Sequence, residues 1–78
     1  MSKFKMEIYM RPTGGVISYD WSTEQDFQRV HAFLMELLGP GGRAGPTPGW
    51  PDFYYVETEQ QEEAFFDFIR TFEVTRGP

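Results

Sequence analysis

The sequence contains no cysteine and only one histidine, and it lacks any long run of apolar residues. Without cysteine the chain forms neither a disulfide framework nor a cysteine-ligated zinc site, so its fold must rest on hydrophobic burial. Its apolar stretches are much shorter than the roughly 20 residues of a membrane-spanning helix. Lys3, Lys5 and Glu7 also interrupt the N-terminal region, where a secretion signal would be apolar throughout. We therefore expect a soluble, cytoplasmic protein.

Basic residues are also scarce. Seven Lys and Arg stand against 12 Asp and Glu, which gives a formal net charge of -5. Proteins that bind a phosphate backbone need a positive surface, so this balance argues against direct binding of nucleic acid. A length of 78 residues predicts one small domain, residues 1–78, and the aromatic content of 18% supplies the core volume that length does not.

The N-terminal third has the alternation of a β-hairpin. Residues 4–10 place an apolar side chain at every second position, as in a strand with one buried and one solvated face. Pro12, Gly14 and Gly15 then favour a turn, after which residues 16–21 resume a β-rich pattern. The alternation also places Tyr9 on the solvated face.

A first helix is predicted after the hairpin. Residues 22–25 fit a capping box with Ser22 as the N-cap, and Gly39 followed by Pro40 marks the end. Between them, apolar residues recur at spacings of three and four: Phe27, Val30, Leu34, Leu37 and Leu38.

A second helix is predicted over roughly residues 59–72, after a second capping box at residues 58–61. Its apolar stripe consists of Phe65, Phe68, Ile69 and Phe72. The tail after residue 72 either adds a short strand at Val74 or frays, and the sequence leaves this open.

A loop and a third strand separate the two helices. Residues 39–52 contain five Gly and four Pro, which fits neither a helix nor a strand, and residues 53–57 are typical of a strand. The sequence thus predicts a small α+β domain of order ββαβα, with a three-stranded, mainly antiparallel sheet and both helices on one face. Whether the second and third strands run parallel stays open at this stage.

No motif for catalysis, metal binding or cofactor binding is present. His31 has no serine or cysteine nucleophile in a recognisable context, so a structural role is favoured over an acid or base role with a carboxylate. Glu59, Glu62 and Glu63 share a helix face but lack the spacing of a calcium loop. The glycine-rich loop lacks the Lys and Ser/Thr of a phosphate loop. We expect a protein that is not an enzyme and has no cofactor or metal.

Some aromatic residues do not fit the predicted core. Phe66 lies outside the apolar stripe of its helix, and Tyr54 and Tyr55 must point to opposite faces of their strand. Trp50, in the loop, either anchors that loop to the core or stands out toward a partner. A three-stranded sheet with both helices on one face leaves an apolar surface available for another molecule.

These features predict a small acidic protein-binding module, an inhibitor or regulator that occludes a basic surface of another protein and in one version mimics nucleic acid. The candidate contact residues combine acids, aromatics and one arginine: Glu59, Glu62, Glu63, Phe66, Tyr54, Trp50 and Arg43. In size, acidity and surplus of aromatics the chain is similar in kind to small phage-encoded inhibitors such as anti-CRISPR proteins and to bacterial immunity proteins. The alternatives are an antitoxin-type protein and a homodimeric structural or assembly subunit that uses the open sheet face.

Overall fold

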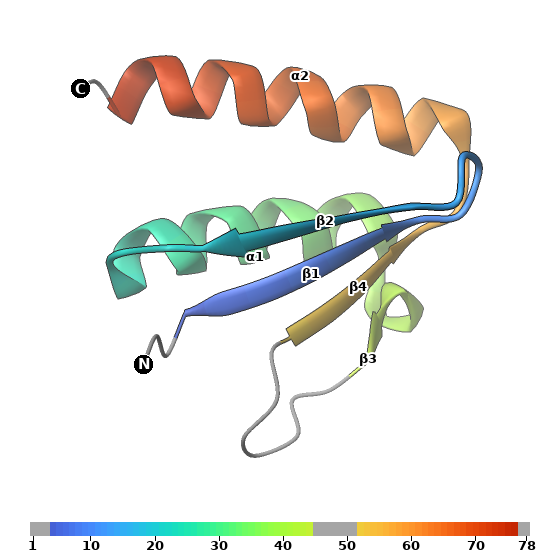
Figure 1. Cartoon of the computed structure of the whole chain (residues 1–78), viewed down its shortest axis with the longest axis horizontal. Helices are drawn as coiled ribbons and strands as arrows, with labels where there is room; N and C mark the ends of the chain where they lie inside the picture. The colour runs from blue at the N-terminus through green and yellow to red at the C-terminus, as the bar shows by residue number, and fades with distance from the viewer. Residues whose placement is uncertain (1–3, 45–51, 77–78) are drawn as a thin grey trace.

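The computed structural model describes residues 4–44 and 52–76 and has the predicted α+β class, and its longer elements follow the predicted ββαβα order, to which one short strand is added (Figure 1). Its elements are β1 (Lys5–Met10), β2 (Gly15–Asp20), α1 (Glu24–Leu38), the 3-10 turn η1 (Pro40–Gly42), β3 (Arg43–Ala44), β4 (Asp52–Val56) and α2 (Glu59–Arg76). The turn η1 and the two-residue strand β3 lie inside the predicted loop, and β3 makes the sheet four-stranded.

The strands are ordered β2-β1-β4-β3 across the sheet. β1 pairs antiparallel with β2 and parallel with β4, and β3 pairs antiparallel with β4. Since β2 and β4 flank β1 and run in opposite directions, α1 does not join two parallel strands. Instead it carries the chain from the edge strand β2 to the far side of β1. The second and third predicted strands, β2 and β4, are thus antiparallel to each other, an orientation that the sequence left open.

The β1–β2 hairpin is confirmed. Gly14 has a φ of 81°, and its N–H donates to the Met10 carbonyl at 2.6 Å. A side chain at this φ is strained, so glycine suits the position. Beyond the strands, the Trp21 N–H donates to the Phe4 carbonyl at 3.0 Å and extends the ladder by one pair.

The first helix begins one residue later than predicted. Thr23, not Ser22, is the N-cap: its backbone is extended and its hydroxyl accepts the Asp26 N–H at 3.1 Å. Both residues carry the hydroxyl that a cap requires, so the sequence did not distinguish them. The predicted end is confirmed, because Gly39 has a φ of 79° and donates its N–H to the Met35 carbonyl.

The second helix has the predicted capping box. The Gln61 N–H donates to Thr58 Oγ1 at 3.1 Å, and Gln61 Oε1 accepts the N–H groups of Thr58 and Glu57 at 3.2 and 2.9 Å. The helix continues to Arg76, so the alternative strand at Val74 does not form. Neither helix in the described part of the chain is long and apolar enough to cross a membrane.

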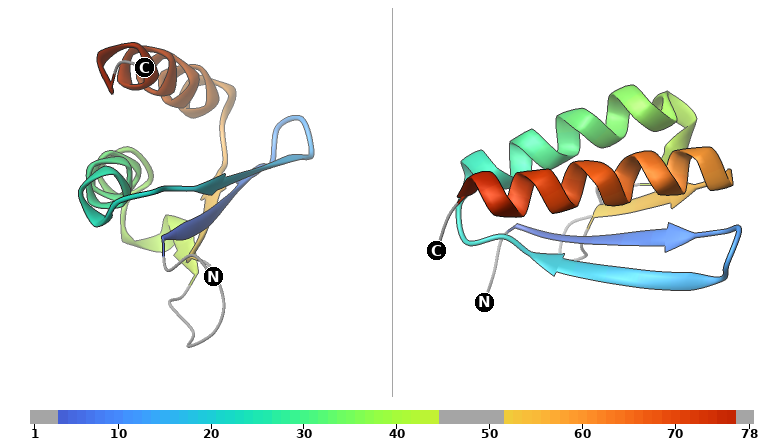
Figure 2. Two further views of the ribbon diagram at one scale, coloured as in Figure 1. Left: turned by 60° about the vertical axis from the view of Figure 1, so that its left-hand side comes forward. Right: turned by 90° about the horizontal axis from the view of Figure 1, so that it is seen from above.

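The core lies between one face of the sheet and both helices, as predicted (Figure 2). In Figure 1, α1 passes behind the sheet and α2 runs beside β2. The rings of Phe33 and Phe68 stack between the two helices with centroids 4.0 Å apart. The buried hydrophobic residues come from the sheet, from the entry to α1 and from both helices: Met6, Ile8, Met10, Trp21, Val30, Leu34, Tyr54, Val56, Phe65, Ile69 and Phe72.

Candidate interaction surfaces

The outer face of α2 carries an exposed phenylalanine among glutamates. At about 100° per residue, Glu59, Glu62, Glu63 and Phe66 fall within an arc of about 100°. The side chains that reach the core, such as Phe65, project from the adjoining side of the helix, about 100° from Phe66. Phe66 is 42% exposed, Glu59 and Glu63 are exposed, and Glu62 is half-buried. The structure therefore brings these predicted contact residues together, and we call the four the α2 face.

Charge on and beside the α2 face is predominantly negative. Thr13 Oγ1, in the hairpin turn, donates to Glu62 Oε2 at 3.1 Å and so links this turn to the first turns of α2. Arg70, one turn after Phe66, is paired with Asp67. Within the described part of the chain, neither Glu59 nor Glu63 has an ion-pair partner. These two carboxylates are therefore available to a cationic group of another molecule.

The remaining predicted contact residues do not join this face. Tyr54 is fully buried beside Ile8 of β1, so its selection as a surface contact needs correction: Tyr55 takes the outward position. Arg43 lies in β3, paired with Tyr54 in the strand register, and its side chain is outside the described residues. Trp50 is also outside the described residues.

The phenol of Tyr54 joins His31 to Asp52 inside the protein. His31 Nδ1 and the Tyr54 hydroxyl are 2.7 Å apart, and this hydroxyl donates to Asp52 Oδ2 at 3.4 Å. The His31 ring also stacks on Phe27, with centroids 6.0 Å apart and nearly parallel planes. Because Asp52 and Tyr54 belong to β4 and His31 to α1, the network attaches the first helix to the sheet. His31 thus contributes to holding α1 on the sheet.

The face of the sheet away from the helices carries a second group of aromatic side chains. The strand register places Val16, Tyr9 and Tyr55 side by side in one row, with Phe53 in the next row. The Tyr9 ring centroid is 5.3 Å from that of Tyr55 and 5.9 Å from that of Phe53. Val16 is 52% exposed. We call these four residues the aromatic patch.

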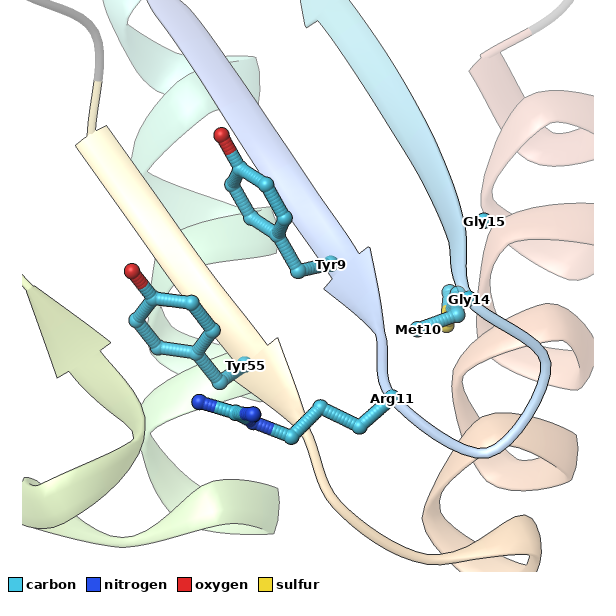
Figure 3. A pocket seen from close by; sticks show the side chains of 6 residues that line it. All are labelled: Tyr9, Met10, Arg11, Gly14, Gly15 and Tyr55. Atoms are coloured by element: carbon cyan, nitrogen blue, oxygen red, sulfur yellow. The ribbon is translucent and has the colours of Figure 1, made fainter.

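Arg11 borders the aromatic patch at the hairpin end. Its guanidinium lies over the Tyr55 ring, 5.0 Å from the centroid, and its Nε is 3.1 Å from Glu57 Oε2. Figure 3 shows Tyr9, Tyr55 and Arg11 on the same side of the sheet, beside a shallow pocket of about 290 Å³. The pocket is lined by Tyr9, Met10, Arg11, Gly14, Gly15 and Tyr55.

Tyr9 is held in its neutral form at ordinary pH. Partial burial of the ring raises the pKa of Tyr9 above its usual value of 10.0, and its hydrogen bond to Glu7, together with the charges of Glu7 and Tyr55, raises it further. The hydroxyl therefore donates to Glu7 Oε1, at 3.2 Å. Alternation identified Tyr9 as outward-facing, but the pairing of β1 with β4, which brings Phe53 and Tyr55 beside it, was not visible in the sequence.

Comparison with protein-family models, with curated proteins and with solved structures gives no match in any of the three. Among residues 4–44 and 52–76, no group of three or more His, Asp and Glu side chains is placed to hold a metal ion.

Proposed function

We propose that this protein is a non-enzymatic binding module of the cytoplasm that covers a basic surface of a partner protein and so acts as an inhibitor or regulator. The observation that carries the proposal is the α2 face, where an exposed Phe66 lies among three glutamates. Isolated apolar residues are ordinary on protein surfaces, but an aromatic ring among predominantly negative side chains, with Arg70 already paired with Asp67, has the composition of an anchor with a polar rim.

The two kinds of side chain have different tasks. Glu59 and Glu63 attract a positively charged surface at long range and so increase the association rate, while exposed ion pairs add little to the final affinity. Phe66 supplies the affinity, because burying the exposed part of its ring contributes about 1 kcal/mol or more. A partner should therefore offer an apolar pocket surrounded by Lys and Arg.

The α2 face is rigid before it binds. The capping box at Thr58 and Gln61 fixes the start of the helix, and Phe65 and Ile69 anchor its adjoining, core-facing side. A preorganised surface loses little conformational entropy on binding, which favours affinity from a small contact area. A basic surface of this description is typical of nucleic-acid-binding proteins, and against such a partner the α2 face acts as a mimic of the phosphate backbone, in the manner of a small phage-encoded inhibitor.

Affinity capture with paired variants tests the proposal. The immobilised protein is exposed to an extract of the source cells, and the captured proteins are compared by quantitative mass spectrometry among the wild type, Phe66→Ala, Glu63→Lys and the control Glu36→Lys. Glu36 is exposed on α1 and undergoes the same change of charge away from the α2 face. We expect a partner captured by the wild type and by Glu36→Lys, and lost with the other two variants.

The purified partner is then titrated with each variant. Phe66→Ala should weaken binding roughly tenfold, as expected of an anchor residue, and Glu63→Lys should mainly slow association and reduce its salt dependence. A partner that binds all four proteins equally well contradicts the proposal, and so does a partner whose contact surface is acidic.

A further inference from the structure

The aromatic patch lies on the face of the sheet that neither helix covers. Both helices pack on the face formed by residues such as Met6 and Ile8, whereas Val16, Tyr9, Phe53 and Tyr55 face away from them. Figure 2 shows α1 and α2 on the same side of the strands. The patch is rigid, because it is formed by paired strands rather than by loops.

The charges around the patch are close to balanced, unlike those of the chain as a whole. Lys5 is directly opposite Asp20 in the register of β1 and β2, and Arg11 is paired with Glu57. The remaining acid is Glu7, whose carboxylate accepts the Tyr9 hydroxyl. In a chain with a net charge of -5, two copies of the α2 face repel each other strongly, whereas two copies of the open sheet face, with one excess acid each, repel each other much less.

The order of charged side chains on the open face is complementary to itself. Glu7 precedes Tyr9 by two residues in β1, about 7 Å at the rise of a strand, and Arg11 follows Tyr9 by two residues, just beyond the end of β1, with its guanidinium on the same face over Tyr55. Consider two copies related by a two-fold axis that lies between the two sheets, passes over Tyr9 and is perpendicular to β1. This axis makes the two β1 strands antiparallel. It therefore places Glu7 of each copy opposite Arg11 of the other, with the two Tyr9 rings in contact between them.

From this symmetry and charge pattern we propose that the open sheet face is a homodimer interface, in which two copies pack face to face with their β1 strands antiparallel. The interface is isologous: the same patch is used twice, and each Glu7–Arg11 contact occurs twice. The aromatic patches form its apolar centre, and the helices lie on the two outer sides. Sheets pack in this aligned manner about 10 Å apart in β-sandwiches.

Sedimentation velocity and light scattering test the proposal on the protein alone, from micromolar to near-millimolar concentration. The wild type should pass from a monomer of 9.1 kDa to a species of twice that mass. Arg11→Glu and Glu7→Arg should each weaken dimerisation about tenfold or more, because each places like charges in contact at two symmetric positions. The double variant, which exchanges the two charges, should restore the dimer.

Two controls separate the interface from the fold. Arg70→Glu makes the same change of charge on α2, where Arg70 is paired with Asp67, and should leave the dimer intact. Circular dichroism and thermal melting verify that each variant is folded. Tyr55→Ser removes an aromatic ring of the patch without changing the charge, and it should weaken the dimer. A wild type that stays monomeric, a dimer that Arg11→Glu leaves unchanged, or a loss that the exchange fails to restore each overturns the proposal. None of these outcomes depends on Phe66 or Glu63, so the two proposals fail separately.

Discussion

The ring of Phe33 on α1 lies flat against the ring of Phe68 on α2, with centroids 4.0 Å apart and planes inclined by 5°. Phe68 also stacks on Phe72, at 5.7 Å. Both Phe33 and Phe68 are half-buried and pack against the core cluster. This stack joins the two helices, as does the guanidinium of Arg29 on α1, which lies 4.8 Å from the ring centroid of Phe72 on α2, so both contacts help to hold the α2 face in place relative to the sheet.

Phe68→Ala should therefore destabilise the protein by about 2–3 kcal/mol, through lost burial and lost ring contact. Phe66→Ala makes the same change two residues earlier on an exposed side chain and should alter stability by less than about 0.5 kcal/mol. Urea unfolding followed by circular dichroism measures both. Equal destabilisation by the two variants would contradict the assignment of Phe66 to the outer face.

The network around Tyr54 gives a second stability prediction. Tyr54→Phe removes the hydroxyl that links His31 to Asp52 and leaves Asp52, which is 7% exposed, without this hydrogen bond. We expect a loss of about 1–2 kcal/mol in the free energy of unfolding. Tyr55→Phe is the matched control on the solvated face of the same strand, and its stability should be nearly that of the wild type.

Much of the fold was readable from local patterns. The alternation in β1, the glycine turn of the hairpin and the capping box at Thr58 all involve residues close in sequence, and the structure confirms each of them. The N-cap of α1 was misplaced by one residue because Ser22 and Thr23 both carry a suitable hydroxyl. Short-range chemistry thus located the starts of the predicted elements to within about a residue, whereas α2 ends four residues beyond its predicted end.

The surfaces were harder to predict, because they depend on which strands pair. Alternation showed that Tyr54 and Tyr55 point to opposite faces, but the buried one is decided by the pairing of β4 with β1, far away in sequence. The two-residue strand β3 has no local signal at all. Phe66 was identified correctly as an outer residue because helical periodicity alone decides its direction.

Tyr9 provides a prediction for alkaline pH. Partial burial and the Glu7 carboxylate raise the pKa of its phenol above 10.0, so the folded state keeps this proton more tightly than the unfolded state does. The stabilisation that follows is complete below about pH 10 and is lost as the pH rises through the raised pKa of the folded state. The difference between the ultraviolet titrations of the wild type and of Tyr9→Phe should show Tyr9 ionising later than a free tyrosine, and Glu7→Gln should bring its pKa closer to 10.0. An unchanged titration in Glu7→Gln would contradict the role given to this carboxylate.

The two proposed surfaces lie on different sides of the protein, so together they predict a stoichiometry. In the proposed dimer the open sheet face joins the two copies, and each α2 face stays exposed on the outside. The protein should therefore bind its partner as a complex of two plus two. Arg11→Glu should reduce this complex to one plus one. The affinity of the single α2 face should stay unchanged, because Arg11 lies at the opposite side of the sheet from the core that supports Phe66.

Light scattering of the purified complex gives the mass, and calorimetric titration gives the affinity per site. If Arg11→Glu also abolished partner binding while remaining folded, the partner would be using the sheet face, and the assignment of that face to a second copy would be wrong.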